Sequence, residues 1–450
     1  MARLTIAALL VRTFLAMALA AGGTAAHAIS LTDAYDAALR NDPVYRARFY
    51  ENESAKESTT LGRAGLLPNV SASYSAARNS ADLEYQLPDN ATVTQPRYRS
   101  NSGTVQVRQP LLNLEAFQRY RQGRVRAERG QKQFDAATNE VAQRVVGAYF
   151  DALFAEDQVA LVRVQREVYL EQQKLNARFF EKGEGTKTDM LETQVRLDVA
   201  EADLIEAQDN VALRRRALAG VIGIEPGTLE KVGERFTFAE LVPGDVAPWR
   251  SRALSENGDL AAARLAVEEA RLEIKRQRAG HLPRVDLVAN YSRGNNETLN
   301  TYGQATTNRQ ISIQVNVPLY AGGAVSASTR QAGAEYGRLM ADLESRTNAV
   351  VMEVEKAHAQ VKSSVGRIRA LLKAVDSAKT LIIATERSIS GGVRINLDLL
   401  NARQQLFLSQ RDLASARYAY LLGLIRLHGL MRPIGQVDFD DIFRTYPSKE

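Results

Sequence analysis

Two long helical repeats constrain this chain more than any other feature. Positions 350, 354, 357, 361 and their successors to 389 advance by alternating threes and fours, and they hold mainly Val, Ala, Ile and Leu. The series from Val141 to Tyr169 has the same phase 209 positions earlier. This spacing, with its many small residues, predicts closely packed coiled-coil helices. Helices from about 115 to 178 and from about 326 to 389 would each extend on the order of 90 Å, so we expect an elongated molecule.

The rest of the chain repeats with nearly the same period. The segment RAGLLPNVSASYS at 63–75 returns as RAGHLPRVDLVANYS at 278–292, and VRQPLLN at 107–113 returns as VNVPLYA at 315–321. A tandem duplication explains both matches. We expect each copy to contain a helix, a strand, a polar loop, a strand, a very long helix, a glycine turn and a final helix.

These patterns predict bounds for two structural repeats. The first repeat, 29–240, is expected to contain strands at about 67–78 and 102–112, a long helix at about 115–178, a tip turn at 182–188 and a partner helix at about 188–222. The second repeat, 241–450, is expected to contain strands at about 284–294 and 309–320, a long helix at about 326–389, a tip turn at 390–396 and a partner helix at about 396–430. Further helices are expected at about 32–63 and 254–280, polar loops at 79–99 and 293–308, and equatorial segments at about 223–250 and 431–450.

The N-terminus predicts export. Basic residues flank an apolar run that ends in small residues and Ala26-His27-Ala28, which is typical of a secretory signal with a cleavage site. We predict a signal peptide at 1–28. The chain has no cysteine, which excludes a disulfide framework, and its net charge of +6 is too mild to indicate nucleic acid binding.

The predicted strands alternate between apolar and polar residues. QISIQVNVPLY at 310–320 and RVDLVANYS at 284–292 both show this alternation, with Val288 as an exception. An ordinary half-buried antiparallel sheet alternates too. The export signal, the paired hairpins and the polar loops favour strands of a membrane β-barrel. Four strands cannot close such a barrel without leaving edges, so several copies of the chain must assemble.

The sequence offers no catalytic constellation. Phosphate-loop, nucleophile-elbow and zinc-protease motifs are absent, and His281, His358 and His428 are isolated in sequence. We therefore expect no enzyme activity and no cofactor or metal.

Several motifs together resemble the TolC family of outer-membrane channel-tunnel proteins. They are R-A-G-x-L-P before strands one and three, V-x-V-P-L-Y ending in Gly322-Gly323, G-x-R-x-x-x-D-x-L at 392–400 and A-R-Y-x-Y at 416–420. The resemblance implies an α+β fold, in which a long antiparallel helical coiled-coil barrel joins a trimeric 12-stranded transmembrane β-barrel. It implies a homotrimer in outer-membrane lipid that docks with an inner-membrane transporter (ABC or proton-driven) and a periplasmic adaptor, the membrane fusion protein.

The family resemblance also implies a gate at the periplasmic tips. KGEGTKTDMLETQ at 182–194 and GGVRINLDLLNARQ at 391–404 place aspartates at equivalent positions after glycine turns. Mapped by motif, Thr188, Asp189 and Arg394 would latch the inner helix pair to the outer pair, and Asp398 would form a constricting ring. Two positions depart from the family pattern: Asn401 replaces a second ring aspartate, and Ile389 replaces a tyrosine. The glycines expected in the tip turns are Gly183, Gly185, Gly391 and Gly392.

Two alternatives remain open at this level. Asp189 and Asp398 lie in first helical turns, where a carboxylate interacts favourably with the helix dipole, and Asn396 or Thr188 would then be simple N-caps.

The main functional hypothesis is a passive, gated outer-membrane exit duct for type I protein secretion or for efflux of drugs and small molecules. The alternative is a non-pore periplasmic or surface coiled-coil structural or adaptor protein.

Overall fold

The structure, a computed structural model, describes residues 28–86, 91–94, 97–231, 238, 240–298, 301–432 and 434. Apart from Ala28, the predicted signal peptide lies outside the described residues, as does most of the equatorial segment 431–450. Two compact units are present. The first comprises Met1–Arg48, Asp135–Asn257 and Ala349–Glu450, and the second comprises Phe49–Phe134 and Gly258–Asn348. Both units combine segments from both predicted repeats, whose boundaries stay a prediction.

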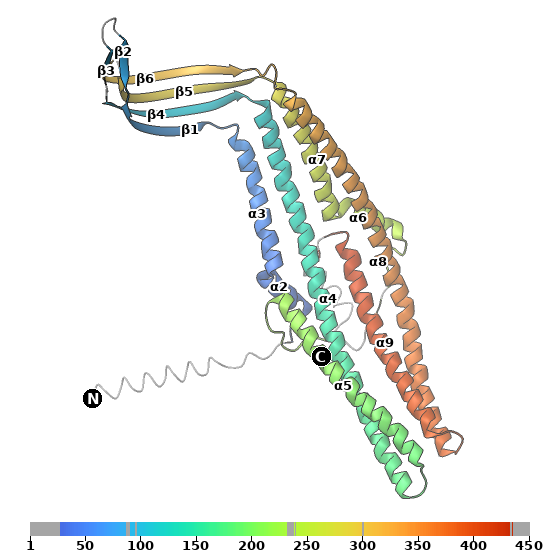
Figure 1. Ribbon diagram of the computed structural model, residues 1–450. Helices are drawn as coiled ribbons and strands as arrows, with labels where there is room; N and C mark the ends of the chain where they lie inside the picture. The colour runs from blue at the N-terminus through green and yellow to red at the C-terminus, as the bar shows by residue number, and fades with distance from the viewer. Residues whose placement is uncertain are drawn as a thin grey trace, which may run out of the picture. The chain divides into compact units, whose positions relative to one another are not determined.

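The long helices form as the heptad pattern indicates. Helix α4 (Leu114–Glu181) has 68 residues and α8 (Ala324–Ser390) has 67. They turn back into α5 (Lys187–Ile222) and α9 (Asn396–Gly429), so that Figure 1 shows two antiparallel helical hairpins. The predicted seam positions are all buried or half-buried, including Val145 and Val361, which are each 0% exposed. The prediction of a coiled-coil helical fold is confirmed.

The core of the first unit forms where α4, α5, α8 and α9 meet α2 (Leu31–Asn41). Its largest side chains are aromatic. The hydroxyl of Tyr149 donates to the carbonyls of Ile29 at 2.8 Å and Glu230 at 3.0 Å, and burial raises the pKa of this phenol. Tyr418 on α9 donates to the Asp157 carboxylate on α4 at 2.7 Å. Burial, followed by the charge of Asp157, raises the pKa of Tyr418. These bonds satisfy the polar ends of side chains whose rings fill the core.

The helix predicted at about 32–63 is broken into two. Asp42 precedes Pro43 and has an extended backbone, because a following proline disfavours the helical conformation. The Asp42 carboxylate accepts from the backbone N–H of Val44 at 2.8 Å, which satisfies the start of α3 (Pro43–Ala64), and it pairs with Arg144. The helix predicted at 254–280 divides in the same way at Asn257, between α6 (Val246–Glu256) and α7 (Gly258–Arg278).

The helices of the second unit pack through small residues and ion pairs. A Cβ at Gly123 of α4 would lie 2.2 Å from the Ser58 carbonyl oxygen of α3, so only glycine permits this approach. Glu269 of α7 pairs with Arg126 at 2.6 Å and with Arg129 at 2.7 Å. The hydrogen bond from Arg276 lowers the pKa of Glu273 to about 2.

The second unit also holds a four-stranded antiparallel sheet of order β1-β4-β5-β6. Its strands are β1 (Asn69–Ser80), β4 (Arg97–Leu112), β5 (Arg284–Thr298) and β6 (Thr301–Asn316), and a separate hairpin joins β2 (Leu83–Gln86) to β3 (Ala91–Thr94). The loops predicted at 79–99 and 293–308 are therefore largely wrong, because polar residues on one face of a strand read as loop in the sequence. Strand β6 ends before Pro318, which has no N–H for the ladder.

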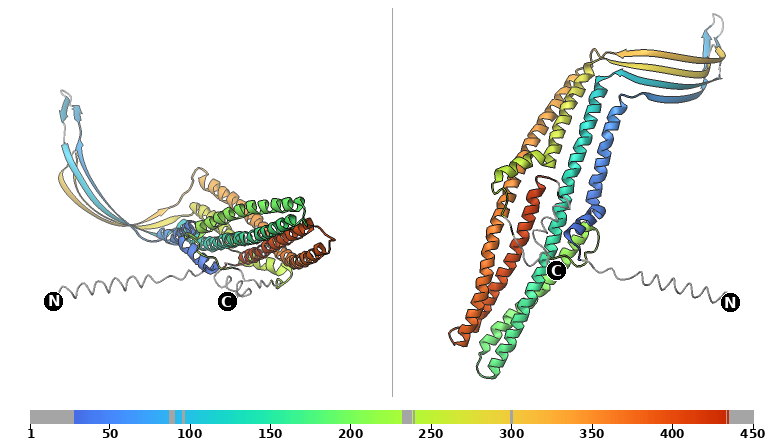
Figure 2. Two further views of the ribbon diagram at one scale, coloured as in Figure 1. Left: turned by 90° about the horizontal axis from the view of Figure 1, so that it is seen from below. Right: turned by 180° about the vertical axis from the view of Figure 1, so that it is seen from behind.

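The two faces of this sheet differ sharply in polarity. Val105 pairs with Ala72 and Tyr291, while the neighbouring Gln106 pairs with Ser71 and Asn290. One face therefore carries the exposed Val70, Tyr74, Val105, Tyr291, Ile311, Ile313 and Val315. The opposite face carries mainly Ser, Thr, Asn and Gln, together with the Arg108–Asp286 ion pair and the buried Val288. Its positions on β4 and β5 are the more buried, as expected for the concave side of a curved sheet. Figure 2 shows this curvature. Among the helices that the structure describes, none has the length and apolarity of a membrane span.

Candidate functional site

The two hairpin turns have the same backbone conformation. Gly183 has φ +77° and Gly392, its counterpart 209 positions later, has φ +72°. In the first turn the N–H of Gly183 donates to the Phe180 carbonyl, and in the second the N–H of Gly392 donates to the Ile389 carbonyl. Glu184 and Val393 each donate to the carbonyl five residues before them, at 2.8 and 2.9 Å. A left-handed residue with these bonds is the usual glycine termination of a helix.

The helices after the two turns begin differently. Thr186 is the N-cap of α5: its hydroxyl accepts from the Asp189 N–H at 3.1 Å, and the Asp189 carboxylate accepts from the Thr186 N–H at 3.3 Å. This reciprocal capping box satisfies two helix-terminal donors. The N-cap of α9 is Ile395, which has no side-chain oxygen. The hypothesis of Thr188 or Asn396 as a simple N-cap is therefore wrong. The N-cap of α5 lies two residues before Thr188, and the N-cap of α9 lies one residue before Asn396.

Asp398, the equivalent of Asp189 in the second hairpin, and the predicted latch residue Arg394 make no capping hydrogen bond at the start of α9. Asp398 is half-buried and Arg394 is exposed. Within the described part of the chain, neither side chain makes a hydrogen bond or an ion pair. Their roles as ring and latch stay predictions.

A cleft of about 590 Å³ separates the ends of the two hairpins. Four of the predicted site residues line it: Gly185, Asp189, Ile389 and Arg394. Glu184, Glu386 and Arg403 add charge to the same walls. The structure does not place Thr188, Asp398, Asn401, Gly183, Gly391 or Gly392 on this cleft.

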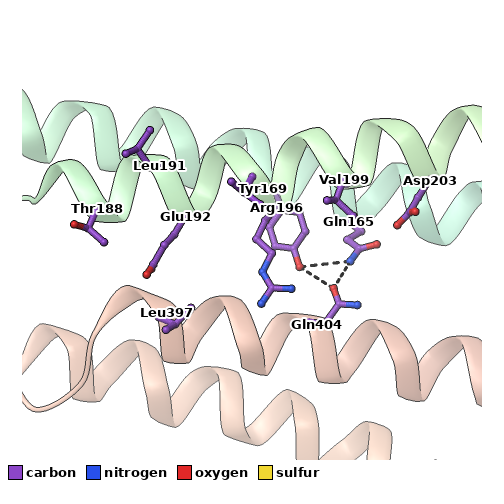
Figure 3. A pocket seen from close by; sticks show the side chains of 12 residues that line it. Gln165, Tyr169, Thr188, Leu191, Glu192, Arg196, Val199, Asp203, Leu397 and Gln404 are labelled. Atoms are coloured by element: carbon purple, nitrogen blue, oxygen red, sulfur yellow. Dashed lines mark hydrogen bonds between the residues drawn. The ribbon is translucent and has the colours of Figure 1, made fainter.

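A second cleft, of about 470 Å³, lies between α4, α5 and α9 (Figure 3). Thr188 and Arg196 line it from α5. Arg196 donates to the Asn401 side-chain oxygen at 3.1 Å, which joins the two hairpins at an exposed position. Deeper in this cleft, Gln404 accepts from Gln165 at 2.7 Å and from Tyr169 at 3.1 Å.

A buried polar network connects the hairpins near their ends. Its centre is Thr193, which is 0% exposed and makes three hydrogen bonds: it accepts from Asn176 at 2.8 Å and from Asn396 at 3.3 Å, and it donates to the Asp189 carbonyl at 2.9 Å. Gln172 donates to the Asn396 side-chain oxygen at 3.0 Å. Such bonds inside a packed interface fix the register of the helices they join.

The network extends from α9 to α8 through Arg403. This side chain donates to Gln172 at 3.1 Å and pairs with Glu386 of α8 at 3.2 Å. The two hairpins are thus joined by consecutive hydrogen bonds from α5 through α4 to α9 and α8. In this arrangement a shift of one hairpin against the other breaks several bonds together.

Our sequence reasoning missed this network. The signal was present as a heptad stripe of polar residues, in which Gln165, Tyr169, Gln172 and Asn176 follow Val162 at spacings of three and four. All four are at most 9% exposed. The heptad series counted from Val141 instead passes through Arg166 here, and this side chain pairs with Glu201. Polar residues in a heptad stripe read as solvent-exposed unless the partner helix is known.

Comparison with known proteins decides the family. A family model described as "Outer membrane efflux protein" matches residues 34–224 and 249–431. The chain belongs to this family. The outer membrane efflux protein family comprises channel proteins and not enzymes. The predicted family and the predicted outer-membrane location are therefore confirmed.

The individual relatives agree with the family. The chain is 39% identical to "Alkaline protease secretion protein AprF" of Pseudomonas aeruginosa, over 94% of this chain and 89% of the relative. It is 28% identical to "Outer membrane protein TolC" of Vibrio cholerae, over 95% of this chain and 96% of the relative. The solved structure of CusC, a protein described as forming a transmembrane channel, matches with a TM-score of 0.78 at 17% identity, over 90% of this chain and 92% of that chain. An outer-membrane export channel is confirmed over a non-pore coiled-coil protein.

Proposed function

We propose that three copies of this chain close a twelve-stranded barrel in the outer membrane. The observation that supports this is the open sheet, whose edge strands β1 and β6 have no neighbour on one side among the described residues. Unpaired strand edges are not tolerated in lipid, so the edges must pair between copies. Four strands per copy make twelve in a trimer, with the apolar face outward and the polar face around the pore.

Because the chain contains no cysteine, crosslinking between introduced cysteines tests the trimer. A cysteine at Ser73 of β1 is combined with single cysteines scanned along β6 from Asn308 to Ser312. Oxidation should produce a covalent trimer on a denaturing gel for one or two adjacent β6 positions. In the control the β1 cysteine is replaced by one at Ser102 of β4, a central strand whose neighbours are β1 and β5, and no crosslink to β6 is expected. Crosslinking that stops at dimers, or that is independent of position, would contradict the trimer.

The chain would act as a passive duct with a gate at its hairpin ends. In this proposal three Asp398 carboxylates surround a narrow axis, and Arg394 helps to latch the inner helix pair to the outer pair. Opening is a rigid-body untwisting of the α8–α9 hairpin against α4–α5, which would break the Arg403 and Thr193 contacts. The duct would receive cargo from an inner-membrane transporter through a periplasmic adaptor.

The gate is tested by the double variant Arg394→Ser and Asp398→Ala in planar bilayers. We expect a several-fold higher single-channel conductance, since both the ring charge and the latch are removed. The control is Arg411→Ser with Asp412→Ala, which removes the same charges from an exposed pair farther along α9. Equal conductance in the wild type and the gate variant would contradict the assignment.

The cargo of the duct is a secreted protein. The 39% identity to AprF over nearly the full chain supports protein secretion over drug efflux. Expression of the chain in Pseudomonas aeruginosa lacking AprF should restore alkaline protease to the medium. Restored resistance to small toxic compounds in an efflux-deficient strain, without restored protease secretion, would favour efflux instead.

A further inference from the structure

The charged side chains on the polar face of the sheet lie toward one end. Among the strand residues whose side chains the structure describes, the charged ones on this face are Arg108 of β4 and Arg284 and Asp286 of β5. Arg284 is the first residue of β5, so this is the end of the sheet that joins the helices (Figure 1). We call these three residues the charged cluster. Farther along the two central strands, the same face holds the uncharged Ser102, Thr104, Gln106, Asn290 and Ser292.

Within the charged cluster the carboxylate is buried and a guanidinium group is exposed. Arg108 lies directly opposite Val288, so that Asp286 is its diagonal neighbour across the two strands. The Nη2 group of Arg108 donates to the Asp286 carboxylate. The Asp286 side chain is only 6% exposed, whereas the Arg108 side chain is 50% exposed. The negative charge is therefore covered, and the positive charge faces outward from the polar surface.

The second arginine of the cluster has a neutral partner. Arg284 is exposed and lies directly opposite Asn316 of β6. It donates to the Asn316 side-chain oxygen at 3.0 Å, with this amide in the orientation that the donor requires. The Asp286 carboxylate already accepts from Arg108. Two arginines and one aspartate leave the cluster with a net charge of about +1 at neutral pH.

The segments between the sheet and the helices do not neutralise this charge. They contain neither Asp nor Glu, and they are residues 65–68, 113, 279–283 and 317–323. The acidic residue nearest in sequence is Glu115, in the first turn of α4. Its carboxylate pairs with Arg119 at 3.2 Å and with Arg276 of α7 at 3.3 Å. The helix end of the polar face therefore keeps its positive charge.

We propose that the charged cluster forms an anion-binding ring in the pore. The proposal rests on the proposed trimeric barrel, because there the polar face surrounds the pore. Three copies would place the cluster around the axis where the barrel meets the helices. Rings of arginine in a pore favour anions, and guanidinium groups bind carboxylate and phosphate by paired hydrogen bonds. Arg284 and Arg108 would contact the anion, and Asp286 would position Arg108 while its own charge stays covered.

The test measures the chloride-to-potassium permeability ratio from reversal potentials in planar bilayers. The parent protein is the full-length gate variant Arg394→Ser with Asp398→Ala, because the proposed Asp398 ring would favour cations. At about 0.1 M salt, where charges act over about 10 Å, Arg284→Gln should lower the ratio about threefold. Asp286→Asn should raise the ratio by a similar factor, because it leaves the charge of Arg108 unopposed. Both changes should disappear at about 1 M salt, where the screening length is about 3 Å.

The matched control is Arg293→Gln, which removes the same charge from an exposed position on the apolar face of the same strand. It should keep the parent ratio, because in the proposed barrel this face points away from the pore. Tripolyphosphate added to the chamber tests binding directly. It should block the parent and the Arg293→Gln variant at similar concentrations, and the Arg284→Gln variant only at several-fold higher concentration.

The sign of the two changes in selectivity separates a charge effect from a structural effect. A purely structural role for Asp286 would not raise the permeability ratio. Because Asp286 is buried, Arg284→Glu replaces Asp286→Asn if that variant does not assemble, and it should lower the ratio further than Arg284→Gln. A parent ratio in the Arg284 variants, or an equal change in Arg293→Gln, overturns the proposal. A protein that conducts with these results refutes only the ring, whereas one that never conducts refutes the proposed duct.

Discussion

The α4–α5 and α8–α9 hairpins share a turn but differ in their chemistry. Both reverse direction at a left-handed glycine with the same backbone hydrogen bonds. At the cap, however, Thr186 in the first hairpin corresponds to Ile395 in the second. At the buried positions, Asn176 corresponds to Thr385 and Thr193 corresponds to Ala402.

The glycines and the backbone hydrogen bonds set the conformation of each turn, whereas the side chains that follow determine which contacts it makes. In the first hairpin Asp189 caps its own helix, and Thr193 is fully hydrogen-bonded, with one of its three bonds coming from Asn396 of the second hairpin. The second hairpin has lost the hydroxyl that would bind Asp398, so this carboxylate is not held by the start of its own helix. The first copy uses the aspartate after its turn to cap its own helix, whereas the equivalent Asp398 of the second copy is left available for contacts with other molecules.

The largest expected difference between the hairpins comes from two buried threonines. Thr193→Val should lower the free energy of local opening of α5 by about 2 kcal/mol, because the Asn176 and Asn396 amides each lose their hydrogen bond to the buried hydroxyl. Thr385→Val is the matched control, since the Thr385 hydroxyl is 1% exposed and has no hydrogen-bond partner among the described residues. This change should be neutral or stabilising by up to about 1 kcal/mol.

Hydrogen–deuterium exchange of the hairpin amides measures both effects. Valine and threonine have the same branched shape, so the comparison isolates the hydroxyl group. If both variants lose similar stability, then Thr385 has a partner in a neighbouring copy, and the contrast between the hairpins is smaller than the single chain indicates.

The two turn glycines should behave alike. Gly183→Ala and Gly392→Ala each force a Cβ into the left-handed region and should each cost about 1–2 kcal/mol of local stability. Gly391→Ala is the control, because Gly391 does not have a positive φ and an added Cβ has at least 3.7 Å of clearance there. Exchange rates in the last turn of α4 and of α8 report the change. Unequal costs at the two glycines would show that the shared backbone geometry is not equally constrained.

Much of this fold follows from periodicity. Alternating threes and fours predicted α4 and α8 to within a few residues, and the glycines predicted both turns. The duplicated sequence also identified Asp189 and Asp398 as equivalent. The polar contacts did not follow, because Thr193, Gln172 and Arg403 are ordinary surface residues until the partner helix is placed against them. The caps were misplaced by one or two residues, since several polar residues follow each glycine and only the backbone selects one.

The caps should be exchangeable between the hairpins. Thr186→Ala removes the capping hydroxyl and should cost about 1 kcal/mol at the start of α5. Ile395→Thr supplies the missing hydroxyl beside Asp398 and should stabilise the start of α9 by about 0.5–1 kcal/mol. Hydrogen exchange of the first-turn amides measures each change, and Ile395→Val is the control without a hydroxyl. If the α9 amides exchange as fast in the Ile395→Thr variant as in the Ile395→Val variant, then Asp398 is held elsewhere.

The smallest effect is expected at Asn401, one of the two positions predicted to depart from the family pattern. Its counterpart in the first hairpin is Glu192, so Asn401→Asp makes the two hairpins alike in charge. The Arg196 bond to this residue would become an exposed ion pair, worth about 0.5 kcal/mol at low salt and less at high salt. Asn401→Ala is the neutral control, since it removes the bond without adding charge. If Asn401 faces the proposed pore axis, the Asp variant also conducts cations over anions more selectively in planar bilayers than the wild type does. If the ion selectivity stays at the wild-type value while the small salt-dependent gain in stability is seen, then Asn401 belongs to the contact between the hairpins. Asp398 alone would then carry the ring charge.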